Sequence, residues 1–300
     1  MNKQLRGSLL LLIAALAWGM AFTAQSSAMD AVEPFTFNGA RSICTFLSLG
    51  AILLIKRDFA RTEDERPAAF GEYLRVGGGM GALLFVASSL QQIGLALHTT
   101  AGKSGFITAL YIVLVPIMGI FVGKRVKPLV WLSVLLSLVG LVLLCVKGSV
   151  GIGAGEWCTF GCAVAFSLHI LFIDRFSAGL NAAKLCLVQF LASGILCWIT
   201  AFAVETPRAA DLLACLPSLL YVGVVSGAVG YTLQILGQKD TDPTVASLLM
   251  CLESVFAALG GWILLGERLS PRELLGCALM LLACATAQLP NRGDMRRDRD

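Results

Sequence analysis

The chain has 300 residues, of which 57% are hydrophobic and only 14% are charged, and its formal net charge is +4. A soluble domain usually carries about a quarter charged residues, so this composition, with its mean hydropathy of +0.81, excludes an ordinary water-soluble protein. A spanning helix needs roughly 20 apolar residues, so the chain has room for about ten spans and little else.

Ten apolar segments follow one another with short connections between them. The predicted spans lie at about 7–28, 35–55, 73–97, 100–122, 128–146, 153–174, 182–204, 213–236, 243–266 and 271–289. Because backbone groups cannot stay unpaired in lipid, apolar runs of this length must be helices. The sequence therefore predicts an all-α membrane protein with ten transmembrane helices.

The first apolar run follows Lys3 and Arg6, as the apolar core of a secretory signal peptide follows its basic start. Such a core has only about 7–15 residues. This run is longer and contains Trp18 and Gln25, so we predict that it is retained as the first helix.

The connections alternate in basic character. One side holds 17 of the 23 Lys and Arg residues: Lys3, Arg6, Lys56, Arg57, Arg61, Arg66, Arg75, Lys124, Arg125, Lys127, Arg175, Lys184, Lys239, Arg292, Arg296, Arg297 and Arg299. Both tails belong to this side, so the number of spans is even. The positive-inside rule then predicts a multi-pass protein of the cell membrane with cytoplasmic N- and C-termini.

The two halves of the chain resemble each other at an offset of 143 residues. Seven of 38 positions agree, and the matched glycines and prolines, such as Gly123 with Gly266 and Pro128 with Pro271, fall at predicted helix ends. We therefore predict one five-helix repeat over 1–148, a second over 149–290, and a tail at 291–300. Because five is odd, the second repeat enters from the opposite face, as in transporters built from inverted repeats around a mid-membrane site.

Ionisable groups at membrane depth are candidates for a functional site. Glu253 lies about midway in the ninth span and could bind a substrate ammonium, carry a proton, or form a structural hydrogen bond. Arg41 in the second span could snorkel outward, pair with an acid such as Glu253, or bind a substrate carboxylate. His169 could take part in proton coupling or be a buried histidine with one hydrogen bond.

Other polar and aromatic residues could line a cavity between the halves, or serve only in packing. Three amides could contact a substrate or clamp helices together, and three aromatic residues could form walls: Gln91, Gln92, Gln234, Trp18, Tyr111 and Tyr231. Phe22 and Gln25 share the helix face of Trp18.

No sequence pattern indicates an enzyme, since GxSxG, HExxH and GxxxxGK[ST] are all missing. We expect no cofactor. The ten cysteines lie mostly in apolar runs without a CxxC pair, which favours buried hydrophobes over a metal site. No basic stripe with interleaved aromatic residues occurs, so we expect no nucleic-acid partner.

Several segments together resemble the EamA-like members of the drug/metabolite transporter superfamily. They are Leu-Ala-Trp18-Gly-Met-Ala-Phe22, Asn38-Gly-Ala-Arg41, the stretch from Gln92 to Ser104, and Leu252-Glu253-Ser254 running on to Gly266-Glu-Arg268. The resemblance covers nearly the whole chain. It implies ten helices, cytoplasmic termini, a central cavity, and transport of small metabolites, often export.

The chain departs from the family pattern at two places. Ser254 follows Glu253 where the family often has proline, which puts a kink there in doubt. In the first repeat, Gly123-Lys124-Arg125 stands where the family usually has a glutamate, which weakens any inference of a symmetric acidic pair.

The sequence thus favours a secondary active transporter that exports a small organic metabolite by alternating access. Amino acids, amines, nucleosides and drug-like compounds are the candidate substrates. A lipid bilayer is the expected environment, and proton coupling and a homodimer are compatible with the sequence. A membrane-embedded enzyme acting on a lipid-linked substrate and a passive channel remain the alternatives.

Overall fold

The computed structural model describes residues 3–56, 59–99, 101–146, 153–265 and 269–288. Within these ranges the regular structure is entirely helical. The predicted boundary between the repeats, the tail at 291–300 and the Gly266-Glu-Arg268 motif lie outside the described residues.

The first half contributes five membrane-length segments. They are α1 (Lys3–Gly19) with α2 (Ala21–Ala28), α3 (Pro34–Ile55), α4 (Phe70–Ala96), α5 (Ala101–Thr108) with α6 (Tyr111–Phe121), and α7 (Pro128–Cys145). Proline begins α3 and α7, where a missing N–H removes no intrahelical hydrogen bond.

The second half contributes the other five. They are α8 (Ala154–Phe176), α9 (Ala182–Val204), a segment of α10 (Ala209–Ala214), α11 (Leu216–Leu220), the π-helix η1 (Tyr221–Gly230) and α12 (Tyr231–Lys239), then α13 (Pro243–Met250) with α14 (Glu253–Leu265), and α15 (Pro271–Ala287). Asp242 caps α13, since its carboxylate accepts from Thr244 N at 2.9 Å.

Each of the ten predicted spans is thus occupied by helix. In the described part of the chain, eight segments are long and apolar enough to cross a membrane, and the segment Pro243–Leu259 is a shorter apolar helix. The tenth, α15, has 17 residues. The fold class predicted from hydropathy is confirmed.

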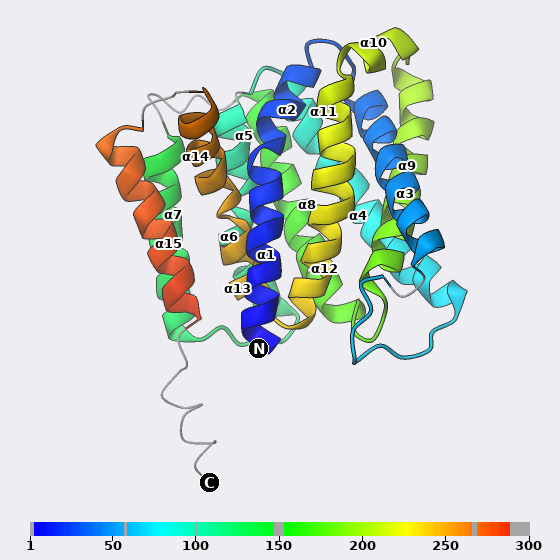
Figure 1. Cartoon of the computed structure of the whole chain (residues 1–300). Coiled ribbons are helices and arrows are strands. Elements are labelled where there is room, and N and C mark those ends of the chain that lie inside the picture. The colour runs from blue at the N-terminus through cyan, green and yellow to red at the C-terminus, as the bar shows by residue number, and fades with distance from the viewer. Residues whose placement is uncertain (1–2, 57–58, 100, 147–152, 266–268, 289–300) are drawn as a thin grey trace.

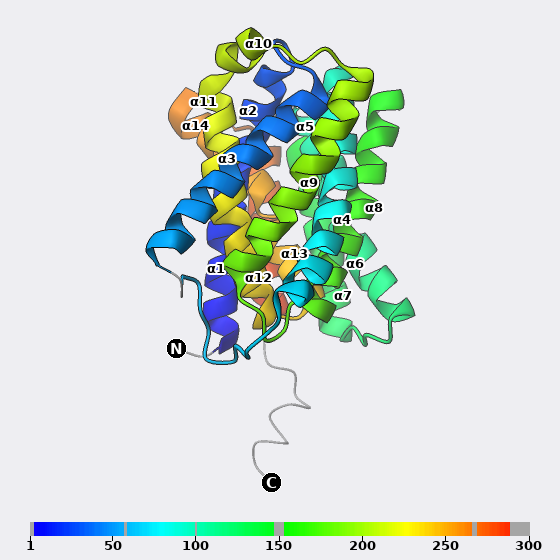
Figure 2. The ribbon, with the colours of Figure 1, turned by 90° about the vertical axis from the view of Figure 1, so that its right-hand side faces the viewer.

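The helices alternate in direction, and α1 begins at the same end of the bundle at which α15 ends (Figure 1). The helix α8, which opens the second half, starts from the opposite end to α1, so the two five-helix units are inverted. Figure 2 shows the same alternation from the side.

The two halves pack against each other through matched pairs of helices. The helix α7 packs on α15, α4 on α8, α3 on α9, and α1 on α12. Small residues permit these approaches: Gly140 and Gly276 face each other so closely that a Cβ on either would overlap the other's carbonyl. The core is therefore shared between the repeats.

Three spans are interrupted near mid-depth. The breaks fall at Met20 between α1 and α2, at 109–110 between α5 and α6, and at 251–252 between α13 and α14. The last two lie at equivalent positions of the repeats, because Ala109 and Leu252 are 143 residues apart.

A proline inside a helix usually kinks it, but the fourth span breaks at 109–110, before Pro116, which lies inside α6. A kink beside Glu253 was in doubt without a proline, yet the ninth span breaks there, with Ser254 N donating to Cys251 O at 3.2 Å.

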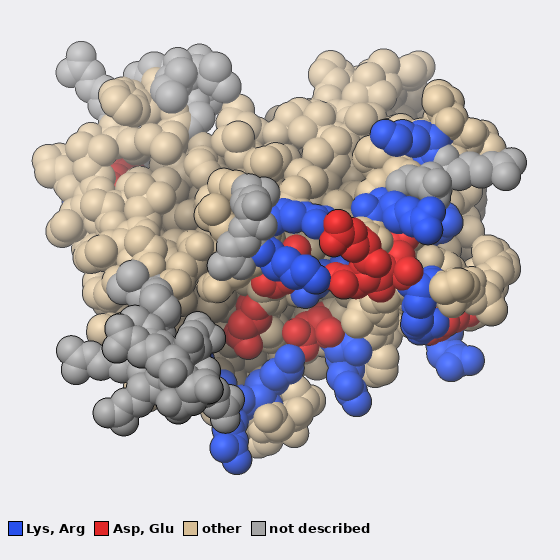
Figure 3. Space-filling model, turned by 60° about the horizontal axis from the view of Figure 1, so that its bottom comes forward, with Lys and Arg blue, Asp and Glu red and all other residues tan. Residues whose placement is uncertain are grey.

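The end at which α1 begins carries mixed Lys, Arg, Asp and Glu side chains (Figure 3). Ion pairs at this end join Lys3 to Asp64 at 3.0 Å and Lys124 to Asp174 at 2.6 Å. Along the helices, large apolar side chains such as Leu54 face outward. A charged end above an apolar belt is the surface expected of a membrane protein.

At the opposite end, a carboxylate joins the two halves. The Glu205 side chain, at the end of α9, accepts from Phe35 N at 2.8 Å, Thr36 N at 2.7 Å and Thr36 Oγ1 at 2.7 Å. In return, Glu33 accepts from Thr206 N at 2.9 Å. Glu205 therefore supplies the N-terminal hydrogen bonds that α3 lacks within itself.

We expect Glu205→Ala to lower the free energy of unfolding by about 1–3 kcal/mol, because hydrogen bonds to a charged acceptor are lost at a helix N-terminus. Thermal unfolding of the purified protein in detergent measures this as a lower midpoint. Glu63→Ala, which alters an exposed carboxylate between α3 and α4, is the matched control. Equal midpoints for the two variants would contradict the role given to Glu205.

Candidate functional site

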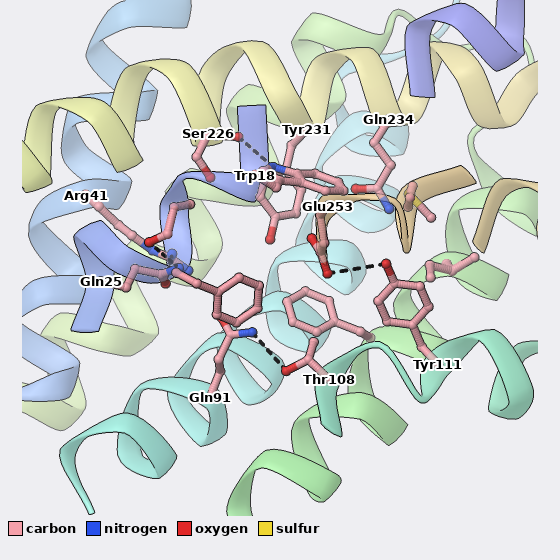
Figure 4. Close-up of a pocket in the computed structure, with 15 residues that line it drawn as sticks. Trp18, Gln25, Arg41, Gln91, Thr108, Tyr111, Ser226, Tyr231, Gln234 and Glu253 are labelled. Carbon is pink, nitrogen blue, oxygen red and sulfur yellow. Dashed lines mark hydrogen bonds between the residues drawn. The ribbon is translucent and has the colours of Figure 1, made fainter. Parts of the chain in front are cut away.

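A pocket lies between the two halves, and the three breaks and η1 surround it (Figure 4). It encloses about 540 Å³ of empty volume, including the open space at its mouth. It is lined by Trp18, Ala21, Phe22, Gln25, Arg41, Gln91, Thr108, Tyr111, Phe166, Ile170, Ser226, Tyr231, Gln234, Met250 and Glu253. Seven of the nine predicted site residues are in this set.

Glu253 forms the acidic side of the pocket. It is the first residue of α14, it is 6% exposed, and the Tyr111 hydroxyl donates to its Oε1 at 3.5 Å. Among the described residues, no Lys, Arg or His side chain forms an ion pair with it. Its place in the first turn of a helix favours a negative charge, and no cation in the described part of the chain compensates that charge.

Arg41 forms the basic side. It lies in α3, it is 5% exposed, and its Nη1 donates to Gln25 Oε1 at 3.1 Å. Its Nε has no hydrogen-bond partner within the described part of the chain. Arg41 thus neither snorkels outward nor pairs with an acid there, and it makes no ion pair with Glu253.

The two charged groups line different parts of the pocket. Figure 4 shows Arg41 and Gln25 at the left, Tyr111 at the right, and Glu253 between them, below Trp18 and bonded to Tyr111. The Trp18 ring lies 5.1 Å from the Tyr231 ring, centroid to centroid. Trp18 and Tyr231 therefore form an aromatic wall of the pocket that also holds Arg41 and Glu253.

Hydrogen bonds to the irregular segments hold two of the pocket-lining side chains in place. Trp18 Nε1 donates to Ser226 O at 3.1 Å, within η1, and Gln91 Nε2 donates to Thr108 Oγ1 at 3.2 Å, beside the break of the fourth span. Gln234 Oε1 is buried and has no partner in the described structure. It can accept a hydrogen bond from a ligand or from water.

Two predicted site residues lie outside the pocket lining. Gln92 is fully buried, and its Nε2 donates to Gln25 O at 3.3 Å, so it supports the pocket from behind. His169 Nε2 lies 2.9 Å from Gln189 Oε1, and its ring is edge-on to Tyr231. Both residues contact a lining residue without lining the pocket.

Several lining residues were not singled out from the sequence. Thr108 and Met250 end the helices that precede the two equivalent breaks, and Ser226 lies in the π-helix. The signal that could have found the first two is the repeat offset, which pairs the regions around 109 and 252. Gln25 was recognised only as sharing a helix face with Trp18.

A long seam runs from the pocket toward the end at which α1 begins. There α1 packs on α12, and a Cβ on Gly237 would overlap both Leu11 and the carbonyl of Gly7. At its end, Arg6 Nε lies 3.9 Å from an Asp240 carboxylate oxygen. The first half contributes one side of the seam and the second half the other.

The arrangement suits reversible binding of a small molecule. Opposite charges held without partners and aromatic walls can recognise a ligand that carries both charges. In the described residues, no group of three His, Cys, Asp or Glu side chains is placed to hold a metal ion.

Known proteins with similar sequences are transporters. A curated protein of Archaeoglobus fulgidus, named only as an uncharacterized transporter, is 31% identical over 96% of this chain and 87% of its own length. The uncharacterized transporter YwfM of Bacillus subtilis is 26% identical over 92% and 91%. The threonine/homoserine exporter RhtA of Escherichia coli K12 is 25% identical over 91% and 90%.

A solved crystal structure shares the fold, with a TM-score of 0.76 at 21% identity over 94% of this chain and 98% of that chain. The model of the EamA-like transporter family matches the sequence twice, over residues 5–146 and 153–287. These matches and the inverted five-helix units give the same result: the chain is a two-repeat member of the EamA-like transporter family of multi-pass membrane proteins.

Proposed function

We propose that this protein is a secondary active exporter of a small zwitterionic amino acid. The observation that carries the proposal is the pocket itself, which is lined by buried Arg41 and buried Glu253, neither of which forms an ion pair with another described residue. The name of the relative RhtA, a threonine/homoserine exporter, supports an amino acid among the candidate substrates.

In this proposal the substrate carboxylate binds Arg41 and its ammonium binds Glu253. A guanidinium matches a carboxylate in shape and charge, and a carboxylate accepts hydrogen bonds from an ammonium. Each buried charge then gains the partner that it lacks in the free protein. A ligand with only one of the charges leaves the other uncompensated, so the pocket disfavours simple amines and simple acids.

We also assign proton coupling to Glu253. Without substrate, Glu253 holds a proton and contacts Tyr111; with substrate, it is ionised and holds the ammonium. Substrate and proton thus compete for one carboxyl group, which makes their movements across the membrane opposite. The proposed orientation has both termini in the cytoplasm, in agreement with the basic connections on that side.

Transport requires that the pocket open to each side in turn. We assign the cytoplasmic barrier to the α1–α12 seam, because it lies between the pocket and the end at which α1 begins, and because each half supplies one side of it. Separation of α1 from α12 opens the seam to the cytoplasmic side.

We expect Arg41→Gln and Glu253→Gln each to reduce threonine uptake into proteoliposomes at least tenfold. Loss of one buried charge partner commonly costs about 2–5 kcal/mol, and a tenfold change in affinity corresponds to about 1.4 kcal/mol. Glu253→Gln should also abolish the dependence of uptake on an imposed pH gradient.

The controls are Arg75→Gln and Glu63→Gln, which alter exposed charges and should transport as the wild type does. Wild-type rates in both pocket variants would remove these charges from the mechanism. A wild-type protein that transports no amino acid of a full panel would overturn the proposed substrate class.

A disulfide across the seam should stop transport. We expect oxidation of the double variant Arg6→Cys/Asp240→Cys to block threonine counterflow and reduction to restore it, since these two side chains meet at the end of the seam, with Arg6 Nε 3.9 Å from an Asp240 carboxylate oxygen. The single variants control for the ten native cysteines, and mass spectrometry identifies the cross-link. Undiminished counterflow in fully cross-linked protein would show that the seam does not open.

A further inference from the structure

Arg41 is held by a neutral side chain. Its Nη1 donates to the amide oxygen of Gln25, and no carboxylate among the described residues pairs with it. Burying a guanidinium without a counter-charge is unfavourable. The residue that holds Arg41 in this unpaired state is Gln25.

The Gln25 amide is fixed in the orientation that serves Arg41. Its Nε2 donates to Ala21 O at 3.2 Å, which leaves Oε1 to face the guanidinium. The reversed amide would place its N–H groups against those of Arg41, which is unfavourable because both groups only donate. The backbone carbonyl of Gln25 in turn accepts from Gln92 Nε2 at 3.3 Å. Residue 25, itself 4% exposed, is therefore set before any ligand binds.

An amide oxygen and a carboxylate oxygen affect the guanidinium differently. Both accept its N–H and can orient it, but only the carboxylate neutralises its charge. With glutamine at this position, Arg41 is oriented and its charge remains available. With glutamate, the chain itself would supply the counter-charge, and a substrate carboxylate would meet an ion pair that is already satisfied.

We propose that Gln25 is a positioning residue that determines specificity: it orients Arg41 while leaving its positive charge for the carboxylate of the substrate. This inference rests on the proposed amino-acid function, and it assigns to residue 25 the choice between a zwitterion and an amine. A carboxylate at this position converts the pocket into one for a cationic amine, because Glu253 then remains as the one charge without a partner.

Two ligands that differ only in the carboxylate test the choice. Threonine and its decarboxylated amine, 1-aminopropan-2-ol, are titrated against purified protein by thermal shift and compete for uptake in proteoliposomes. The wild type should prefer threonine. Gln25→Glu should bind threonine at least tenfold more weakly and bind the amine more tightly, so that the preference reverses.

The variant Gln25→Ala tests the orientation of Arg41 separately from its charge. It leaves the charge of Arg41 in place but removes its support, so threonine binding should weaken several-fold while binding of the amine stays as in the wild type. This variant also keeps the proposal testable if Gln25→Glu does not fold, which size-exclusion chromatography in detergent would show.

The results distinguish the proposed function from the role of Gln25. A wild type that binds no amino acid overturns the proposed function. A wild type that prefers threonine, with the same ratio of threonine to amine affinity in Gln25→Glu and Gln25→Ala, overturns the role of Gln25 and leaves the proposed function standing. If Gln25→Glu is unfolded, an unchanged ratio in Gln25→Ala alone overturns it.

Discussion

The backbone of a membrane protein must satisfy its own hydrogen bonds, because lipid offers none. Helices meet this condition, and interruptions of a helix are tolerated where the freed groups face protein or a cavity. In this chain the interruptions at Met20, 109–110 and 251–252 surround one pocket, and the π-helix η1 joins them. The pocket exists where the regular helices stop, and Tyr111 and Glu253 each begin the helix that follows a break.

Electrostatics complements this backbone arrangement. A buried ion without a partner destabilises the folded protein, and this pocket holds a buried guanidinium and a buried carboxyl group that can carry the opposite charge. Direct pairing of Arg41 with Glu253 would satisfy both, but it would also close the pocket to any ligand of mixed charge. Gln25 and Tyr111 give each ion a neutral partner instead. A ligand that supplies the opposite charges is therefore expected to stabilise the protein when it binds.

Hydropathy and loop charge were sufficient to predict the ten helices and the parity of their number, because the apolar length of a span and the asymmetry of its flanks are local properties. Membrane depth was sufficient to select Glu253 and Arg41. The break at 251–252 could not be predicted, since no proline or glycine adjoins it and it depends on the neighbouring helices. The partner of Arg41 was likewise hidden, because Gln25 meets it only through the packing of two helices. Gln92 and His169 had the expected polarity and depth, but their positions on the helix direct them behind the pocket wall.

The bond from Glu205 to the start of α3 has a mechanical consequence. It ties α3, and with it Arg41, to α9 of the other repeat, and α4 packs on both α8 and α9. Glu253 lies instead in α14, which packs on α1 and α7. A molecule that binds both charges therefore connects two groups of helices, each of which is drawn from both repeats.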